Sequence, residues 1–169
     1  DAALHAIPGV SSASSSTSPL LSMEKMPFNV TVEGVEAEPL SVSSNHVSPN
    51  FFRTFGTELL AGRDFTDADS ASFNFNGAAV VVNHQFAERF GFTPDEVIGR
   101  RISIGSGSSS VVVGVIGDLR FSGKVTDEIA PQVFFSSIIR RAFYVRSARS
   151  PEELFSAIRE TVARVDPTL

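Results

Sequence analysis

The apolar residues of this chain come in short runs that turn-forming residues interrupt. The two strongest runs, Ala78–Val82 and Val111–Ile116, are far shorter than the ~20 apolar residues that a membrane-spanning helix needs. Their β-branched residues favour buried strands. We therefore expect a sheet assembled from many short strands. Further strand-like segments are Phe28–Val32, Leu40–Val47, Arg101–Ile104, Gln132–Ser136 and Ala142–Arg146; Val10–Ser18 is a strand or a serine-rich loop, and Glu58–Phe65 is a strand or an extended connection.

Helix signals lie between these strands. Ser150–Glu153 forms a capping box with proline at the first helical position, and Pro167 ends the helix that follows. An apolar stripe at helical spacing predicts that this helix packs on a sheet; the stripe consists of Leu154, Phe155, Ile158, Val162 and Val165. Shorter helices are predicted in Asp1–Ile7, Ser48–Gly56, Asn83–Phe90 and Thr93–Gly99. Short strands mixed with a few helices predict the α+β class.

The segment Ser48–Gly56 has the signals of a complete small helix. Ser48 is the expected cap, Pro49 suits the first helical position, and Gly56 suits the left-handed position at the end. Helical spacing then places Phe51, Phe52 and Phe55 on one side. The chain has 15 Phe, 1 Tyr and no Trp. Because a phenylalanine ring has no polar group, we expect most of these rings in the core.

Charge and cysteine content exclude several classes of partner and site. The formal net charge is -5, and the 14 Lys and Arg residues are scattered, with adjacent pairs only at Arg100–Arg101 and Arg140–Arg141. No basic footprint for nucleic acid results, and acidity disfavours anionic lipid headgroups. With no cysteine in the chain, disulfides and thiolate metal sites are excluded.

Serine and glycine motifs do not indicate an active site. Gly105–Ser110 resembles a phosphate-binding loop, but such a loop needs a helix after it, and the strand-like run Val111–Ile116 follows instead. A hairpin turn is the interpretation that fits. No G-x-S-x-G nucleophile elbow occurs among the many serines.

The histidines and acidic residues also indicate no catalytic site and no metal site. His5, His46 and His84 lie far apart and have no paired ligand spacing. The acidic turn with Asp64, Asp67 and Asp69 lacks the glycine and terminal glutamate of a calcium loop, so we expect it to be solvated. Asp118 follows a buried strand, yet the loop Arg120–Asp127 offers it no histidine or second placed acid. We therefore expect no catalytic residues, no metal ligands and no cofactor.

Several segments together resemble one protein family, in that family's order. They are Val47–Gly56 with Leu59–Phe65; Val80–Asn83 with Phe86–Ala87 and Ile98–Arg100; Val112–Asp118; Pro131–Phe134; and the helix Pro151–Asp166. The chain resembles the MacB-like (FtsX-type) periplasmic core domain of ABC transporter permeases. Any one of these segments is weak evidence, but their collinearity over most of the chain is specific.

The resemblance implies a fold in two parts. A porter-like βα subdomain would comprise residues 1–77 with 137–169, and a smaller, mainly β, sabre-like subdomain would be inserted as residues 78–136. The polar segment Thr66–Asn76 is predicted to be a loop. The chain would cross between the two parts near Thr66–Gly77 and Ser136–Arg141. The sequence also opens at Asp1 within a predicted helix end, which suggests a piece of a larger protein.

The resemblance also implies a mechanical function without catalytic residues. Such domains lie on the extracytoplasmic (periplasmic) face of the bacterial cytoplasmic membrane, between transmembrane helices of an integral membrane protein. They transmit ATP-driven conformational change to exported substrate or to periplasmic partner proteins. The implied partners are the permease's own transmembrane helices, its cytoplasmic nucleotide-binding domain, a second permease copy in a dimer, and, as a further candidate, a periplasmic adaptor protein.

Two alternatives from other functional classes stay open. An extracytoplasmic sensor would bind a small molecule in an apolar pocket lined by several Phe residues. A hydrolase would need a histidine hydrogen-bonded to a cleft serine and to an acid.

Overall fold

A computed structural model describes residues 2–20, 26–70, 77–105, 107–120 and 128–165. Asp1, residues 71–76 of the predicted polar loop, Ser106, residues 121–127 and Pro167 lie outside the described residues. The helices are α1 (Ala2–His5), α2 (Phe51–Phe55), α3 (Asp67–Ser70), α4 (His84–Arg89), α5 (Pro94–Val97) and α6 (Pro151–Val165). The strands are β1 (Val10–Ser16), β2 (Met26–Val32), β3 (Leu40–Val47), β4 (Leu59–Gly62), β5 (Ala79–Asn83), β6 (Arg101–Ile104), β7 (Ser108–Ile116), β8 (Gln132–Ser136) and β9 (Ala142–Ser147). The chain is thus mixed α and β, as the sequence predicted.

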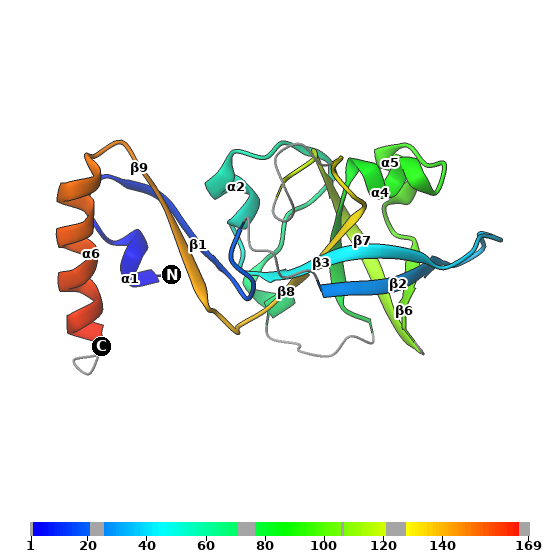
Figure 1. Ribbon diagram of the computed structural model, residues 1–169, viewed down its shortest axis with the longest axis horizontal. Helices are drawn as coiled ribbons and strands as arrows, with labels where there is room; N and C mark the ends of the chain where they lie inside the picture. Colours follow the sequence, from blue (N-terminus) through cyan, green and yellow to red (C-terminus); the bar gives the residue numbers. More distant parts are fainter. Residues whose placement is uncertain (1, 21–25, 71–76, 106, 121–127, 166–169) are drawn as a thin grey trace.

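Six strands close into a barrel, which forms the larger body in Figure 1. Along the sheet they follow the order β2-β6-β7-β5-β8-β3, and a further pairing of β2 with β3 joins the two ends of this path. The β3–β8 and β5–β7 pairs are parallel, and the other pairs in the circuit are antiparallel. Closure leaves these strands without free edges over their paired lengths.

The barrel interior is filled with small branched side chains. Alternation along β5 places Val80 and Val82 in the interior cluster and Val81 in a second cluster outside. All six barrel strands contribute to the interior cluster, which α4 and α5 extend with Phe86, Ala87 and Val97. The outer cluster lies under α2. Three uninterrupted valines in β5 therefore reflect burial on both faces, as the apolar run predicted.

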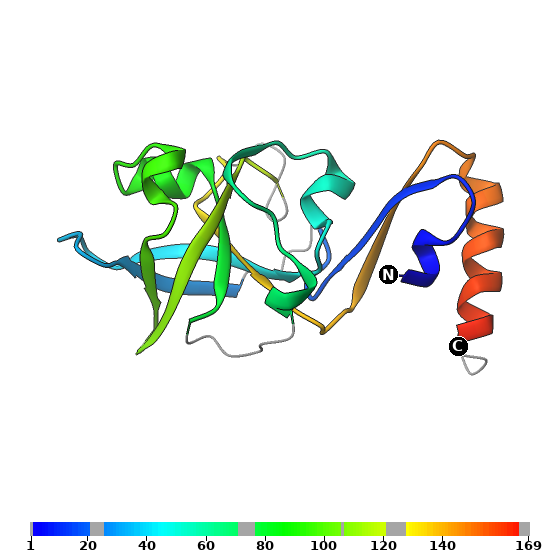
Figure 2. The same ribbon diagram turned by 180° about the vertical axis from the view of Figure 1, so that it is seen from behind.

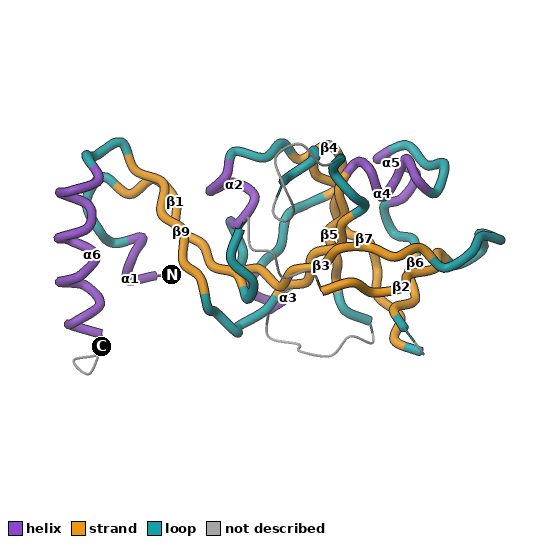
Figure 3. Tube along the Cα trace, in the orientation of Figure 1, coloured by secondary structure: helices purple, strands orange, loops and turns teal. Residues whose placement is uncertain are grey.

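A second, smaller body is a two-stranded ribbon with two helices, which lies to the left of the barrel in Figure 1 and to its right in Figure 2. Strands β1 and β9 pair antiparallel, and α1 and α6 pack against the ribbon around Leu4, Ile7 and Ala13. We call β1, β9, α1 and α6 together the ribbon lobe. Figure 3 shows its long β1–β9 arm in orange, leading from the barrel to the helices.

The sheet runs across the boundaries of the predicted subdomains. Strands β2, β3 and β4, from the predicted segment 1–77, pair with β6, β8 and β7 of the predicted insertion 78–136. The division into 1–77 with 137–169 and 78–136 stays a prediction about subdomains. Strand pairing by itself groups β2–β8 around the barrel and leaves β1 and β9 in the ribbon lobe.

Local predictions held where hydrogen-bonding partners are close in sequence. Asn83 caps α4, with its side-chain oxygen accepting a hydrogen bond from Phe86 N at 3.1 Å. Thr93 and Glu96 form the predicted capping box of α5. Gly56 ends α2 in the left-handed conformation at φ 70°. Local side-chain chemistry is sufficient to determine these helix ends.

Two local predictions were wrong. Asn50, with a left-handed φ of 66°, is the cap residue of α2, so Pro49 precedes the helix and does not occupy its first position. The predicted cap, Ser48, instead accepts a hydrogen bond through Oγ from Ser15 N at 2.8 Å. Its hydroxyl oxygen is therefore bonded to strand β1 and not to the first turn of α2. On α6, Phe155 and Val165 are 61% and 70% exposed rather than packed on the sheet. The ribbon is too narrow to cover the whole apolar stripe of that helix.

The predicted polar loop and hairpin also differ in detail. Asp67–Ser70, within the segment predicted as a loop, forms the single turn α3. The hairpin of β6 and β7 has a shorter turn than predicted, because β7 already begins at Ser108.

Candidate functional site

The three histidines do not form a site together. His5 lies at the end of α1, His84 begins α4, and His46 lies in β3. The His46 ring stacks on Phe135 with 5.1 Å between ring centroids, and burial lowers the pKa of its imidazole. A buried imidazole that stacks on a neighbouring ring is typical of a core residue. The described part of the chain contains no group of three or more His, Cys, Asp or Glu that could hold a metal ion.

The acidic turn is organised by an ion pair. Arg63 donates to both carboxylate oxygens of Asp69, at 2.8 and 3.0 Å, and Thr66 donates to Asp69 through its backbone N and its hydroxyl, both at 2.7 Å. The hydrogen bond from Arg63 is the largest reason why the pKa of Asp69 is lowered to about 2. Burial raises the pKa of the Asp64 carboxyl. The expectation of a merely solvated turn was wrong for Asp69, because an arginine six residues earlier satisfies its carboxylate.

Asp118 takes part in a hydrogen-bond network at the end of three strands. Its Oδ1 accepts from Asn83 Nδ2 at 3.0 Å and from Gln85 N at 3.2 Å. The other side-chain atom of Asn83, Oδ1, accepts from Gln132 N at 2.8 Å in addition to capping α4. The fully buried Asn83 thus joins β5, β7 and β8. Its capping role was visible in the sequence, but its bonds to residues 35 and 49 positions away were not.

The glycine loop that resembled a phosphate site is a hairpin turn. It connects the antiparallel strands β6 and β7, and no helix N-terminus follows it. Its two glycines, Gly105 and Gly107, have φ values of 60° and 129°, a backbone conformation that favours glycine. A structural requirement of the turn therefore explains the glycines without a ligand.

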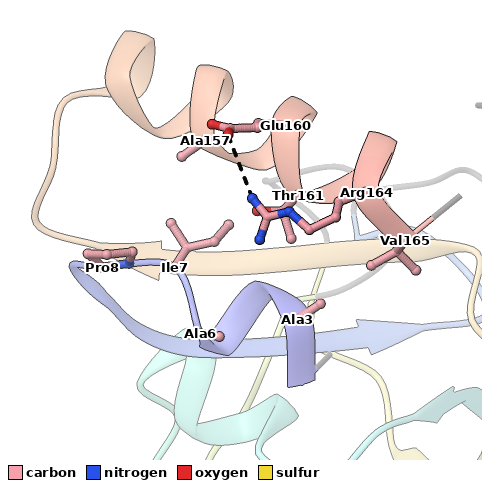
Figure 4. Close-up of a pocket in the computed structure, with 9 residues that line it drawn as sticks. All are labelled: Ala3, Ala6, Ile7, Pro8, Ala157, Glu160, Thr161, Arg164 and Val165. Atoms are coloured by element: carbon pink, nitrogen blue, oxygen red, sulfur yellow. Dashed lines mark ion pairs between the residues drawn. The ribbon is translucent and has the colours of Figure 1, made fainter. Parts of the chain in front are cut away.

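Two pockets can be compared with the expectation of a phenylalanine-lined binding site. One, of about 320 Å³, lies between α1 and α6 (Figure 4). Figure 4 shows Ile7 and Val165 at its wall and the ion pair of Arg164 with Glu160, whose atoms are 3.7 Å apart. The other, of about 720 Å³, lies beside α4 and residues 128–131. Among the residues that the structure describes, no phenylalanine and no histidine lines either pocket.

The junction between the ribbon lobe and the barrel has the most distinctive chemistry. Small hydroxyl side chains of β1 are buried there, and Ser12 Oγ lies 2.7 Å from Thr54 Oγ1 of α2. Tyr144 of β9 packs its ring against Phe51 and Phe55 of α2, with centroid distances of 5.7 and 4.9 Å. We call these contacts the junction. Two features of the sequence belong to the junction, the serine run of β1 and the single tyrosine, but neither identified a partner.

Gly62 and Gly114, which lie in the family-like segments Leu59–Phe65 and Val112–Asp118, are required by close contacts between two backbones. A Cβ atom on Gly114 of β7 would overlap the carbonyl oxygen of Arg63, and one on Gly62 would overlap that of Val113. The two backbones therefore approach so closely that only glycine fits.

Arg100 also has a structural role. Its guanidinium lies 4.0 Å from the centre of the Phe92 ring, and its Nε donates a hydrogen bond to Glu96 O at 2.9 Å.

Comparison with known proteins defines the family. The sequence model of the MacB-like periplasmic core domain matches residues 1–168. The chain therefore belongs to this family, the periplasmic domains of MacB-like ABC transporter permeases, which are generally non-catalytic. Curated proteins give no match. In the described part of the chain, no helix is long and apolar enough to cross a membrane.

Solved structures share the fold. The periplasmic region of MacB from Actinobacillus actinomycetemcomitans is similar with a TM-score of 0.65 and 13% identity, over 96% of this chain and 70% of that one. The extracellular domain of the noncanonic ABC-type transporter YknZ from Gram-positive bacteria gives 0.62 and 15%, over 98% and 79%. A domain of a putative permease protein from Porphyromonas gingivalis gives 0.62 and 22%, over 96% and 74%.

Proposed function

We propose that this chain is a non-catalytic transmission domain, which passes ATP-driven conformational change to an exported substrate or to a periplasmic partner protein. Its proposed partners are the transmembrane helices and nucleotide-binding domain of its permease, a second permease copy, and a periplasmic adaptor. The observation that carries this proposal is the division into a barrel and a ribbon lobe joined by a narrow junction. A mechanical role needs two bodies whose relative position can change.

The placement of α1 and α6 supports the proposal. Both helices belong to the ribbon lobe, and the pocket of Figure 4 lies between them. Movement that is delivered through either end of the described chain would therefore reach the ribbon lobe first and the barrel second. The barrel, with its closed sheet and filled interior, would move as one rigid part.

The chemistry of the polar residues also favours a mechanical role. The carboxylates of Asp69 and Asp118 are bound to neighbouring donors, and His46 is packed on Phe135. The sensor alternative required a pocket lined by several Phe residues, and the described residues that line the two pockets above include none. A hydrolase would require a histidine in a cleft, and no histidine is among the described residues that line these two pockets.

Labelling in the full-length permease tests the proposal. The parent protein is expressed in intact cells together with its nucleotide-binding partner. Glu36→Cys is introduced in the exposed β2–β3 connection, and any cysteine outside this 169-residue chain, which itself has none, is first replaced by serine. We expect a membrane-impermeant maleimide to modify this cysteine without cell lysis. Modification only after lysis would overturn the extracytoplasmic location.

A spin label on the same cysteine then tests transmission. We expect the distance between labels in a permease dimer to differ between the nucleotide-free and the ATP–vanadate states. Glu152→Cys, at the start of α6, is the matched exposed position on the ribbon lobe. Unchanged distances at both positions, with ATP hydrolysis intact, would overturn the transmission role.

A further inference from the structure

The backbone connection between the ribbon lobe and the barrel is small. Strands β1 and β3 share a single register pair, Ser16 with Val47. Two backbone hydrogen bonds flank it, from Thr17 N to His46 O and from Ser48 N to Ser15 O, both at 2.9 Å. Within the ribbon lobe, by contrast, β1 and β9 share six register pairs. The ribbon is therefore held together more extensively than it is held to the barrel.

Tyr144 supplies a side-chain connection at the same place. Its ring lies edge-on to Phe51 and Phe55, which belong to the outer apolar cluster of the barrel. Its hydroxyl accepts a hydrogen bond from Leu20 N at 2.8 Å and lies 3.0 Å from Ser16 Oγ. One side chain of β9 thus contacts α2 through its ring and the segment between β1 and β2 through its hydroxyl.

The remaining side chains of this interface are small and polar. Ser12, Ser14 and Ser16 alternate onto the face of β1 that Tyr144 shares, and all three are buried. Ser12 and Ser16 have hydroxyl partners, whereas Ser14 Oγ has no hydrogen-bond partner in the described structure. A buried hydroxyl without a partner is unfavourable and favours separation of the surfaces around it, because water would then satisfy it.

We propose that Tyr144 is a latch between the ribbon lobe and α2. When the latch is released, the ribbon lobe moves away from α2 as one unit and the hydrogen bonds beside the Ser16–Val47 pair break, while the barrel stays closed. The lobe can move as a unit because it has its own apolar cluster around Leu4, Ile7 and Ala13. Use of this motion in transport rests on the proposed function, but the motion itself belongs to the isolated chain.

Amide hydrogen exchange of the isolated chain, followed residue by residue by NMR, tests the latch. In the wild type, the amides of Thr17, Leu20 and Ser48 should exchange faster than those inside the barrel sheet. Tyr144→Phe keeps the ring and removes the hydroxyl, so we expect these three amides to exchange about tenfold faster still, the effect of losing one hydrogen bond. The amides of β5 and β8 should keep their wild-type rates. Ser70→Ala, which removes a hydroxyl pair at α3 and β8, is the control that should leave the junction amides unchanged.

An engineered crosslink tests the same motion without weakening the fold. Ser12→Cys with Thr54→Cys replaces hydroxyl oxygens 2.7 Å apart, in a chain that has no other cysteine. Its matched control is Ser70→Cys with Ser136→Cys, whose oxygens are 2.6 Å apart and do not span the junction. Oxidation of the first pair should slow exchange at the junction amides and should reduce acrylamide quenching of tyrosine fluorescence, which comes from Tyr144 alone. Oxidation of the control pair should do neither.

The outcomes separate the latch from other possibilities. If the junction and barrel amides exchange at one common rate, and Tyr144→Phe accelerates both equally, the chain opens as one cooperative unit and the latch is wrong. If the Ser12–Thr54 crosslink leaves junction exchange unchanged, the ribbon does not move away from α2, and the latch is again wrong. Either result leaves the labelling experiments on the full-length permease unaffected, so failure of the latch and failure of the transmission role are distinguishable.

Discussion

The barrel and the ribbon lobe bury apolar side chains to very different extents. The barrel interior draws on all six strands of a closed sheet, and residues such as Val80, Phe86 and Ile102 are fully buried. The ribbon lobe has a small cluster around Leu4, Ile7 and Ala13, and no residue of its longest helix, α6, is buried. Since buried apolar area supplies most of the stabilisation, the barrel should unfold last and the ribbon lobe should open first.

The largest expected effect comes from the aromatic cluster that α2 presents to both bodies. Phe51→Ala should lower the free energy of unfolding by about 3–5 kcal/mol, because a fully buried ring is replaced by a cavity. Phe55→Ala should lower the free energy of unfolding by less, because the Phe55 ring is only partly buried. Urea unfolding followed by circular dichroism measures both variants. Equal losses for the two would contradict the assigned difference in burial.

The second effect concerns the close approach of β4 and β7 on the barrel. Gly114→Ala should destabilise the chain by about 1–3 kcal/mol, because the added methyl group would overlap the carbonyl oxygen of Arg63. Gly117→Ala is the control, since its Cβ would meet nothing closer than Glu58 O at 3.9 Å. Thermal unfolding of both variants measures the difference in their stability. A stable Gly114→Ala protein would show that the two backbones can separate without cost.

The third effect is a pH dependence of stability from Asp69. Its pKa in the folded chain is about 2, below the ordinary value of 3.8, chiefly because of the hydrogen bond from Arg63. This contribution is present above pH 4 and is lost as the pH falls from about 4 to about 2, where the folded carboxylate takes up its proton. Arg63 is half exposed, so solvent screening reduces the expected contribution to about 1 kcal/mol.

Asp69→Asn tests this contribution. The wild type should be more stable than the variant at pH 6, and the difference should shrink toward pH 2. Urea unfolding at several pH values measures it. Asp64 titrates in both proteins, so the difference mainly reflects Asp69. A pH-independent difference would indicate that the lost hydrogen bonds, rather than the charge, stabilise this turn.

The smallest effects belong to the ribbon lobe. Leu154→Ala should cost about 1 kcal/mol, less than the roughly 2–5 kcal/mol of a fully buried leucine, because this side chain is only partly covered. Phe155→Ala, at a position 61% exposed, should change stability by less than about 0.5 kcal/mol. Hydrogen exchange should place the Leu154 effect in the ribbon lobe. A loss of stability in Phe155→Ala as large as that in Phe51→Ala would indicate that another surface buries this face of α6 in solution.

The sequence predicted those features whose causes are local. The strands Leu40–Val47 and Gln132–Ser136 have the predicted bounds, and the caps at Asn83 and Thr93 form as their spacing indicated. The prediction failed where a side chain bonds to a group that lies outside its own capping or turn motif. Ser48 bonds to Ser15 N instead of capping α2, and Asp69 bonds to Arg63 instead of facing solvent alone. No local pattern contains the information about such partners.

By itself, the sequence determined the α+β class, most of the strands and helices, and, through its collinear motifs, the family. Periodicity and capping chemistry act over a few residues, so one chain is sufficient to detect them. Only the tertiary structure decided that β2 meets β3 to close a barrel, and that Tyr144 meets α2 at the junction. Those contacts join segments far apart in the chain, and they depend on how the whole sheet closes rather than on any single run of residues.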